Sequence, residues 1–177
     1  MSDAALRAYY NERAPVYDHA YSGTAPAWVD AMAADLRAAL ADRHVLEIAC
    51  GTGHWTRYAA EVATSVTAID TAPAMLAIAR AKLADLARVT VVAADAYRLD
   101  ELGGRYTGGL GMQWLSHVPA ARDGDTYEAR ELPDGSTHEI LENYFTADDL
   151  RAMVAPYGTD VRLTMGDWWW WLTYQVR

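Results

Sequence analysis

Three acidic residues surround a short glycine loop in the first half of the sequence. Glu47 lies four residues before Gly51-Thr52-Gly53, and Asp70 and Asp95 each follow a short apolar run. Glycine lets a backbone approach a ligand closely, since no Cβ stands in the way. A carboxylate accepts hydrogen bonds from ribose hydroxyls or an adenine amino group. It also suits a sulfonium cation, which aromatic walls would stabilise further. The pattern predicts a site for a nucleoside ligand.

A dinucleotide such as NAD is the weaker interpretation of the same loop. The dinucleotide fingerprint requires G-x-G-x-x-G, and Gly51 and Gly53 supply only its first two glycines. Thr56 stands at the third position, directly after the bulky Trp55. A pyrophosphate would also meet Glu47 with no compensating base.

The elements around the loop predict an α/β fold. Apolar runs at 44–49, 65–70 and 89–93 alternate with helical segments, which is typical of a parallel sheet covered by helices on both faces. The carboxyl ends of parallel strands share one edge, so the acidic residues are expected to meet there. We expect Thr71 to cap the helix that begins near Pro73, and residues 106–115 to form a fourth strand. Further along, we expect a hairpin around "PDGS" from residues 127–132 and 137–141. We also expect a capping box at Thr146 and Asp149, and a closing antiparallel pair of strands at 161–165 and 168–176.

Composition limits the kinds of partner. The 177 residues suit a single domain, and a net charge of −9 without a basic cluster argues against nucleic acid. Cys50 is the only cysteine, no metal-ligand spacing is present, and no apolar run approaches the roughly 20 residues of a membrane span. We expect a cytoplasmic protein that acts on a small molecule, with no metal and no membrane partner.

Four segments together resemble class I S-adenosylmethionine-dependent methyltransferases. "VLEIACGTGHWT" resembles their first motif, "VTAIDTAPAMLAIAR" the second and "VVAADAYRL" the third, while "YYNERAPVYD" resembles the N-terminal lid of small-molecule methyltransferases. The resemblance implies a Rossmann-like fold that binds S-adenosyl-L-methionine and releases S-adenosyl-L-homocysteine. Asp70 would hold the ribose, Asp95 the adenine amino group, and Met75 would pack near the adenine. The full cofactor set implied is Tyr10, Arg13, Tyr17, Glu47, Ala49, Gly51, Thr52, Gly53, Asp70, Thr71, Met75, Asp95 and Ala96.

The sequence departs from that family in two places. Thr107 occupies the slot near the start of the fourth strand where an acidic residue is usual, and roughly 30 residues, enough for a crossover helix and a strand, are missing after "WLSHVP". We therefore expect a core that lacks one helix and one strand of the usual seven-stranded sheet. The final hairpin would pair with strand four directly, or a homodimer would cover the open edge. The predicted organisation is a single domain over 1–177, with a lid at 1–24, a cofactor-binding core at 25–119 and a C-terminal part at 120–177.

His117, at the expected carboxyl end of strand four, is the candidate catalytic base. Imidazole changes charge near neutral pH, which suits removal of an acceptor's proton during methyl transfer. A histidine that only hydrogen-bonds the cofactor or the backbone is the alternative. Trp114, Tyr9 and Tyr21 are candidates for the substrate pocket, although packing in the core or on the sheet explains them equally well.

Two functions from different classes remain open on the sequence. The first is methyl transfer to an oxygen or nitrogen of a small molecule in specialised metabolism. The second is a non-catalytic protein that binds S-adenosylmethionine or associates with a partner; Thr107 and the missing segment favour it. The sequence does not identify the acceptor, and cleavage of the sulfonium would be a third use of the same site.

Overall fold

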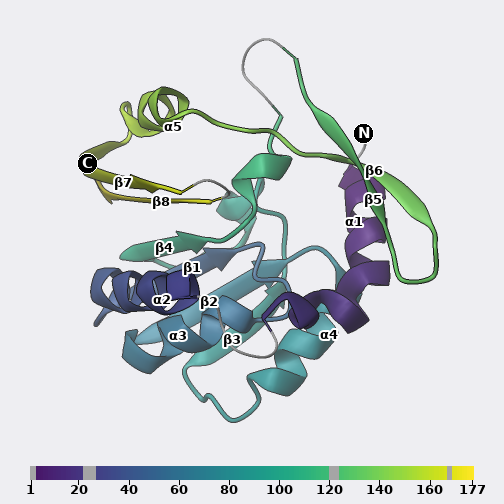
Figure 1. Cartoon of the computed structure of the whole chain (residues 1–177). Coiled ribbons are helices and arrows are strands. Elements are labelled where there is room, and N and C mark those ends of the chain that lie inside the picture. The colour runs from purple at the N-terminus through teal and green to yellow at the C-terminus, as the bar shows by residue number, and fades with distance from the viewer. Residues whose placement is uncertain (1–2, 22–26, 120–123, 167–168) are drawn as a thin grey trace.

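A four-stranded parallel sheet forms the centre of the protein. The computed structural model describes residues 3–21, 27–119, 124–166 and 169–177 (Figure 1). The strands are β1 (His44–Ile48), β2 (Ser65–Asp70), β3 (Val89–Ala93) and β4 (Gly108–Gly111), in the order β3-β2-β1-β4. Glu47 pairs with Ala68 on one side and with Leu110 on the other. The Rossmann-like α/β prediction is confirmed.

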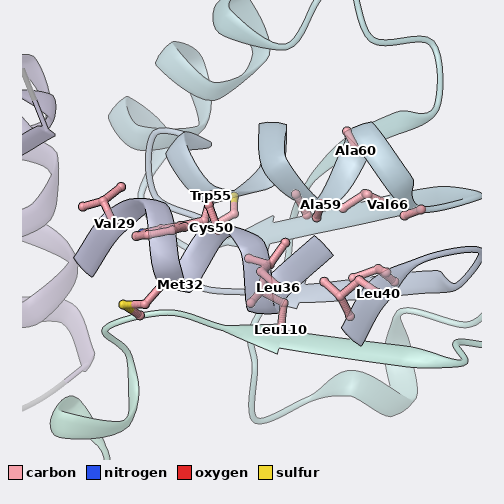
Figure 2. Packing of buried hydrophobic residues seen from close by; sticks show 14 of the residues in the cluster. Val29, Met32, Leu36, Leu40, Cys50, Trp55, Ala59, Ala60, Val66 and Leu110 are labelled. Atoms are coloured by element: carbon pink, nitrogen blue, oxygen red, sulfur yellow. The ribbon is translucent and has the colours of Figure 1, made fainter. Parts of the chain in front are cut away.

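Three helices cover one face of this sheet. They are α2 (Ala27–Leu40), α3 (His54–Val62) and α4 (Pro73–Lys82). The connections β1–α3–β2 and β2–α4–β3 step in the same direction along the sheet, and right-handed crossovers therefore place both helices on the same side. The helices and this face form one core, part of which appears in Figure 2, with members Val29, Met32, Leu36 and Leu40 of α2, Trp55, Ala59 and Ala60 of α3, Leu76 of α4, and Val45, Val66, Ala68 and Leu110 of the strands.

The opposite face of the sheet differs from the sequence-based expectation. The connection from β3 back to β4 must cross that face, and it contains only a short 3-10 helix, η2 (Leu99–Glu101). Strand residues that point this way, such as Leu46, Ile48 and Val92, are only half-buried, and Ile69 alone is fully buried there. The prediction of helices on both faces was wrong, because the described part of the chain supplies no long helix between these two strands.

The fourth strand is shorter than the predicted 106–115. It ends at Gly111, and Gln113 adopts a left-handed backbone with φ of 55°. That conformation breaks the extended geometry a strand requires. The chain then turns through η3 (Leu115–His117), which brings His117 back over the carboxyl end of the sheet.

Two antiparallel hairpins make up most of the second half. β5 (Tyr127–Glu131) pairs with β6 (Thr137–Leu141) as predicted, and β7 (Gly158–Met165) pairs with β8 (Trp170–Val176). Between them lies α5 (Ala147–Val154), whose N-terminus has the predicted capping box of Thr146 and Asp149. Figure 1 shows the β5–β6 hairpin beside α1 on one side of the molecule, and α5 with β7–β8 on the other.

The closing hairpin does not join the parallel sheet. Among the described residues β4 pairs only with β1, and β7–β8 forms a separate two-stranded sheet. The prediction that this hairpin pairs with strand four was therefore wrong. Trp169 and Trp171 instead pack against the helix-covered core, so side chains rather than backbone hydrogen bonds attach the hairpin. Trp168, with which the predicted strand 168–176 begins, lies outside the described ranges.

The N-terminal segment runs across the sheet's carboxyl edge. α1 (Asp3–Arg13) contacts α4 and β6, and the chain continues as a 3-10 helix, η1 (Ala14–Tyr21). The change of helix type occurs at Ala14, next to Pro15, whose ring removes a backbone donor that an α-helix would use. None of the described helices is long and apolar enough to cross a membrane.

Candidate active site

A cavity opens at the carboxyl ends of the parallel strands. Asp70 ends β2, and Asp95 follows β3 by two residues. Both line the cavity, together with Gly51 from the loop after β1. This convergence follows from the parallel topology, since the three strands end at the same edge.

Asp70 is held rigidly by backbone donors. Its Oδ2 accepts a hydrogen bond of 2.9 Å from the Gly51 N–H, and its Oδ1 accepts one of 2.8 Å from the Ala72 N–H. Ala72, not Thr71, is the N-cap of α4, and no side chain of its own caps the helix. The Thr71 capping prediction was wrong: the Ala74 N–H, which a Thr71 cap would bind, donates instead to Oδ1 of Asn11 at 2.9 Å. Burial raises the pKa of Asp70, and the bonds from Ala72 and Gly51 oppose that rise.

The loop after β1 depends on left-handed backbone geometry. Ala49, Gly51 and Gly53 have φ of 52°, 55° and 77°. The left-handed φ of Gly53 favours glycine, and a Cβ there would also lie 2.7 Å from Cδ1 of Leu83 and displace that side chain. Ala49 occupies a left-handed position where a Cβ is unfavourable. The loop therefore turns tightly enough to expose its backbone to the cavity.

Glu47 lies beneath the loop rather than in the cavity wall. Its side chain is 1% exposed, and its Oε2 has no hydrogen-bond partner among the described residues. Burial raises the pKa of the Glu47 carboxyl to about 8. A buried carboxyl oxygen without a partner is unfavourable, so a cationic ligand group close to the loop would suit it.

The η1 segment is tied over the loop by Asp18. The Asp18 carboxylate accepts a hydrogen bond of 2.6 Å from Thr52 Oγ1 and another of 2.8 Å from Lys82 Nζ. Burial alone would raise the pKa of Asp18, but the bonds from Lys82 and Thr52 outweigh it and lower that pKa. The segment is thereby joined to both the loop and α4.

Two tyrosines of η1 bond to a residue of the cavity wall, Gln113. The Tyr17 and Tyr21 hydroxyls donate to Oε1 of Gln113 at 3.3 and 2.6 Å. The Tyr21 ring also stacks on His54 with centroids 3.9 Å apart. Tyr17 lines the cavity, and burial raises its pKa, so its hydroxyl stays protonated. The segment predicted as a lid therefore covers the loop.

His117 is held between α1 and β6. Its Nε2 lies 2.6 Å from the Tyr10 hydroxyl, and its Nδ1 lies 2.6 Å from the Leu141 carbonyl oxygen. Asn143 fastens η3 to the end of β6, because its Nδ2 donates to the Val118 carbonyl and its backbone N–H donates to the Ser116 carbonyl. Hydrogen bonds on both sides of His117 thus fix its position in the cavity wall.

Comparison with known proteins identifies the central part of the chain. Residues 45–129 match the family described as "Methyltransferase domain". They form a class I S-adenosylmethionine-dependent methyltransferase domain. No curated protein matches the sequence.

Solved structures share the fold of this methyltransferase domain. DhpI in complex with SAH is 24% identical, with a TM-score of 0.71 over 92% of this chain and 90% of that one. The magnesium protoporphyrin IX methyltransferase ChlM from Synechocystis PCC 6803 with bound SAM is 19% identical, with a TM-score of 0.68 over 100% of this chain and 98% of that one. At these identities the likeness establishes the fold.

The methyltransferase domain brings most of the expected site residues to one cavity. Those in its wall are Tyr10, Tyr17, Ala49, Gly51, Asp70, Thr71, Met75, Asp95, Ala96, Trp114 and His117. Glu47 lies beneath the loop, and Thr52 and Gly53 are buried parts of the loop itself. Tyr21 does not line the cavity.

Tyr9 and Arg13 are not brought to the cavity wall. Tyr9 is 2% exposed and packs with Leu132 and Ile140 of the β5–β6 hairpin. Arg13 donates to the Tyr9 hydroxyl at 2.9 Å and lies 5.1 Å from the Tyr17 ring centroid. Their spacing on α1 turns both side chains toward the hairpin and η1 rather than toward the cavity.

Several residues of the cavity wall were not predicted from the sequence. Gln113, which accepts from both lid tyrosines, follows directly from a glycine-rich strand with no motif of its own. Tyr97 packs against Trp114 with centroids 5.8 Å apart, and its place two residues after Asp95 was a signal that could have identified it. The others are Leu6, Arg7, Ala72, Ala94 and Met112.

Proposed function

We propose that this protein transfers a methyl group from S-adenosylmethionine to an oxygen or nitrogen of a small molecule. The observation that carries the proposal is the cavity wall in which Asp70, Asp95 and the Gly51 backbone converge. Asp70 would accept from the ribose hydroxyls and Asp95 from the adenine amino group. The sulfonium supplies an activated methyl group and a neutral leaving group.

The residues of the chain would bind and orient the two reactants. Met75 and Ala96 would enclose the adenine, while Tyr17, held by Gln113, would exclude water from the methyl group. Glu47, whose buried Oε2 has no hydrogen-bond partner among the described residues, would stabilise the ammonium of the cofactor's amino acid end through the loop. Alignment of acceptor and methyl group in a dry site is the main requirement of an in-line displacement.

The acceptor half of the cavity supports a small, partly aromatic substrate. Tyr97 and Trp114 form one wall, and His117 lies across from the lid. His117 would take the proton from an acceptor that carries one. Small-molecule chemistry is also what the printed name of ChlM describes for that protein.

Calorimetry with S-adenosylhomocysteine tests the cofactor site. Asp70→Asn should weaken binding by about 10- to 100-fold, since a hydrogen bond to a charged group contributes roughly 1.5–3 kcal/mol. Asp85→Asn, on the exposed surface after α4, is the matched control and should leave the affinity unchanged. Equal affinity of the Asp70→Asn variant would refute the site.

Methyl transfer to a panel of phenols, amines and carboxylates tests the reaction. Turnover of any of these acceptors supports the proposed methyl transfer. A non-catalytic S-adenosylmethionine-binding protein is the second candidate, favoured by the sheet face that no long helix covers within the described residues. Tight binding without turnover across the panel would support it instead.

Light scattering would test the predicted homodimer separately.

A further inference from the structure

The hydrogen bonds of His117 determine its tautomer. Its Nδ1 lies 2.6 Å from the Leu141 carbonyl oxygen, which can only accept. Nδ1 therefore carries a proton, and in the neutral imidazole Nε2 is an acceptor. The free electron pair of His117 is thus on Nε2.

That electron pair faces a tyrosine hydroxyl. The Tyr10 hydroxyl lies 2.6 Å from Nε2 and must donate to it in this tautomer. The two rings meet edge to face with centroids 5.6 Å apart. A proton leaving an acceptor cannot reach Nε2 directly while Tyr10 occupies it.

Tyr10 itself is accessible to a ligand. It lines the same cavity as His117 and Trp114, and it contributes from α1 rather than from the sheet. Its oxygen keeps lone pairs that can accept a second hydrogen bond while its proton is donated to Nε2. The charged or titratable groups around Tyr10 are Tyr17, Arg13, Glu142 and Tyr9, and burial is the main reason why its pKa is raised.

We propose that Tyr10 is a catalytic residue that relays the acceptor's proton to His117. The proposal rests on the proposed methyl transfer. The acceptor O–H bond breaks as its proton passes to the Tyr10 oxygen, while the Tyr10 O–H proton passes to Nε2 of His117. The acceptor oxygen bonds to the methyl carbon, and the electron pair of the broken carbon–sulfur bond stays on sulfur. Tyr10 ends neutral, and His117 ends as an imidazolium whose Nδ1–H is bonded to the Leu141 carbonyl.

The relay defines the class of acceptor. A carboxylate arrives without a proton, so it gives the relay nothing to transfer. An aromatic hydroxyl must lose its proton, and the Tyr10 hydroxyl, 2.6 Å from Nε2, gives that proton a path to His117. The aromatic wall of Tyr97 and Trp114 suits such a ring. We therefore assign the acceptor to groups that carry a proton before methylation, and a phenol is the probe that suits this wall.

Nitrogen-15 NMR of the histidine side chains tests the relay without turnover. The wild-type protein should show His117 as the Nδ1–H tautomer, with Nε2 shifted as a hydrogen-bond acceptor. Tyr10→Phe removes only the donor and should move the Nε2 resonance toward that of a free imidazole. Tyr157→Phe, at an exposed tyrosine outside the cavity, is the control and should move neither resonance. An Nε2–H tautomer, or an unmoved Nε2 in Tyr10→Phe, would overturn the relay.

Kinetics with two acceptors completes the test. Tyr10→Phe should lower kcat for a phenol by about 100-fold, as expected when a general-base pathway is lost. The loss of kcat for a carboxylate should be much smaller, because a carboxylate gives the relay no proton to transfer. Full phenol turnover in Tyr10→Phe, or equal losses for both acceptors, overturns the relay alone. No turnover of any acceptor by the wild-type protein overturns the proposed reaction, and the relay with it.

Discussion

The two faces of the parallel sheet come from the same strands but have different surroundings. On the helix-covered face, Val45, Val66 and Ala68 are at most 1% exposed. On the opposite face, their strand neighbours Leu46 and Thr67 are only half-buried. The difference teaches that alternate residues of one strand are buried by different segments, since each face of the sheet is covered by a different connection between strands. Local β–α–β units provide the first layer of helices. A second layer would have to come from the connection between β3 and β4, which contains only η2.

The largest expected effect is a change of stability with pH, which Glu47 on the covered face causes. Its pKa rises from 4.5 to about 8 on folding, so between these pH values the folded state binds a proton that the unfolded state releases. Stability should therefore fall as pH rises through this window, by up to about 5 kcal/mol at 1.36 kcal/mol per pKa unit.

Glu47→Gln removes that titration. Urea unfolding of the ligand-free protein should be measured at several pH values between 5 and 8. The free energy of unfolding of the variant should increase relative to that of the wild type as pH rises. Parallel stability curves for the two proteins would mean that the carboxyl is not buried as the structure places it.

A pair of leucine truncations compares the two faces directly. Leu36 of α2 is 0% exposed in the covered core, and Leu36→Ala should cost about 3 kcal/mol. Leu46→Ala on the open face should cost about 1 kcal/mol, because less apolar area is removed from contact. Equal losses in urea unfolding would show that something covers the second face in solution.

The smallest expected effect is a gain in stability, at the turn where β1 ends. Ala49 has φ of 52°, a conformation that costs an alanine about 1–2 kcal/mol. Ala49→Gly should therefore stabilise the protein by about 0.5 kcal/mol after the entropy of glycine is counted. Thermal unfolding measures this, with Ala93→Gly at the end of β3 as a control that should destabilise. A loss in both variants would contradict strain at Ala49.

Sequence was sufficient for features that depend on local signals. The first three strands, the glycine loop and the Thr146 capping box each depend on neighbouring residues, and their prediction was confirmed. Asp70 and Asp95 followed from topology, since parallel strands end together. The predicted cofactor and substrate roles of these residues stay predictions.

Sequence failed where burial or contact depends on distant segments. Apolar residues on both sides of β1 predicted two helix layers, although only one is present in the described chain. The Tyr10–His117 bond joins residues 107 apart, and no local pattern indicates it. The closing hairpin was predicted beside β4 because a crossover helix and a strand are missing from the sequence, but Trp169 and Trp171 attach it through packing instead.

The two backbone bonds to Asp70 have a consequence for affinity. Because Gly51 and Ala72 already fix both carboxylate oxygens, the side chain loses no rotamer freedom when a ligand arrives. The entropy of ordering this group is spent during folding, and its remaining lone pairs are preorganised. Any change that loosens the β1–α3 turn will consequently weaken ligand binding, even when the altered residue never touches the ligand.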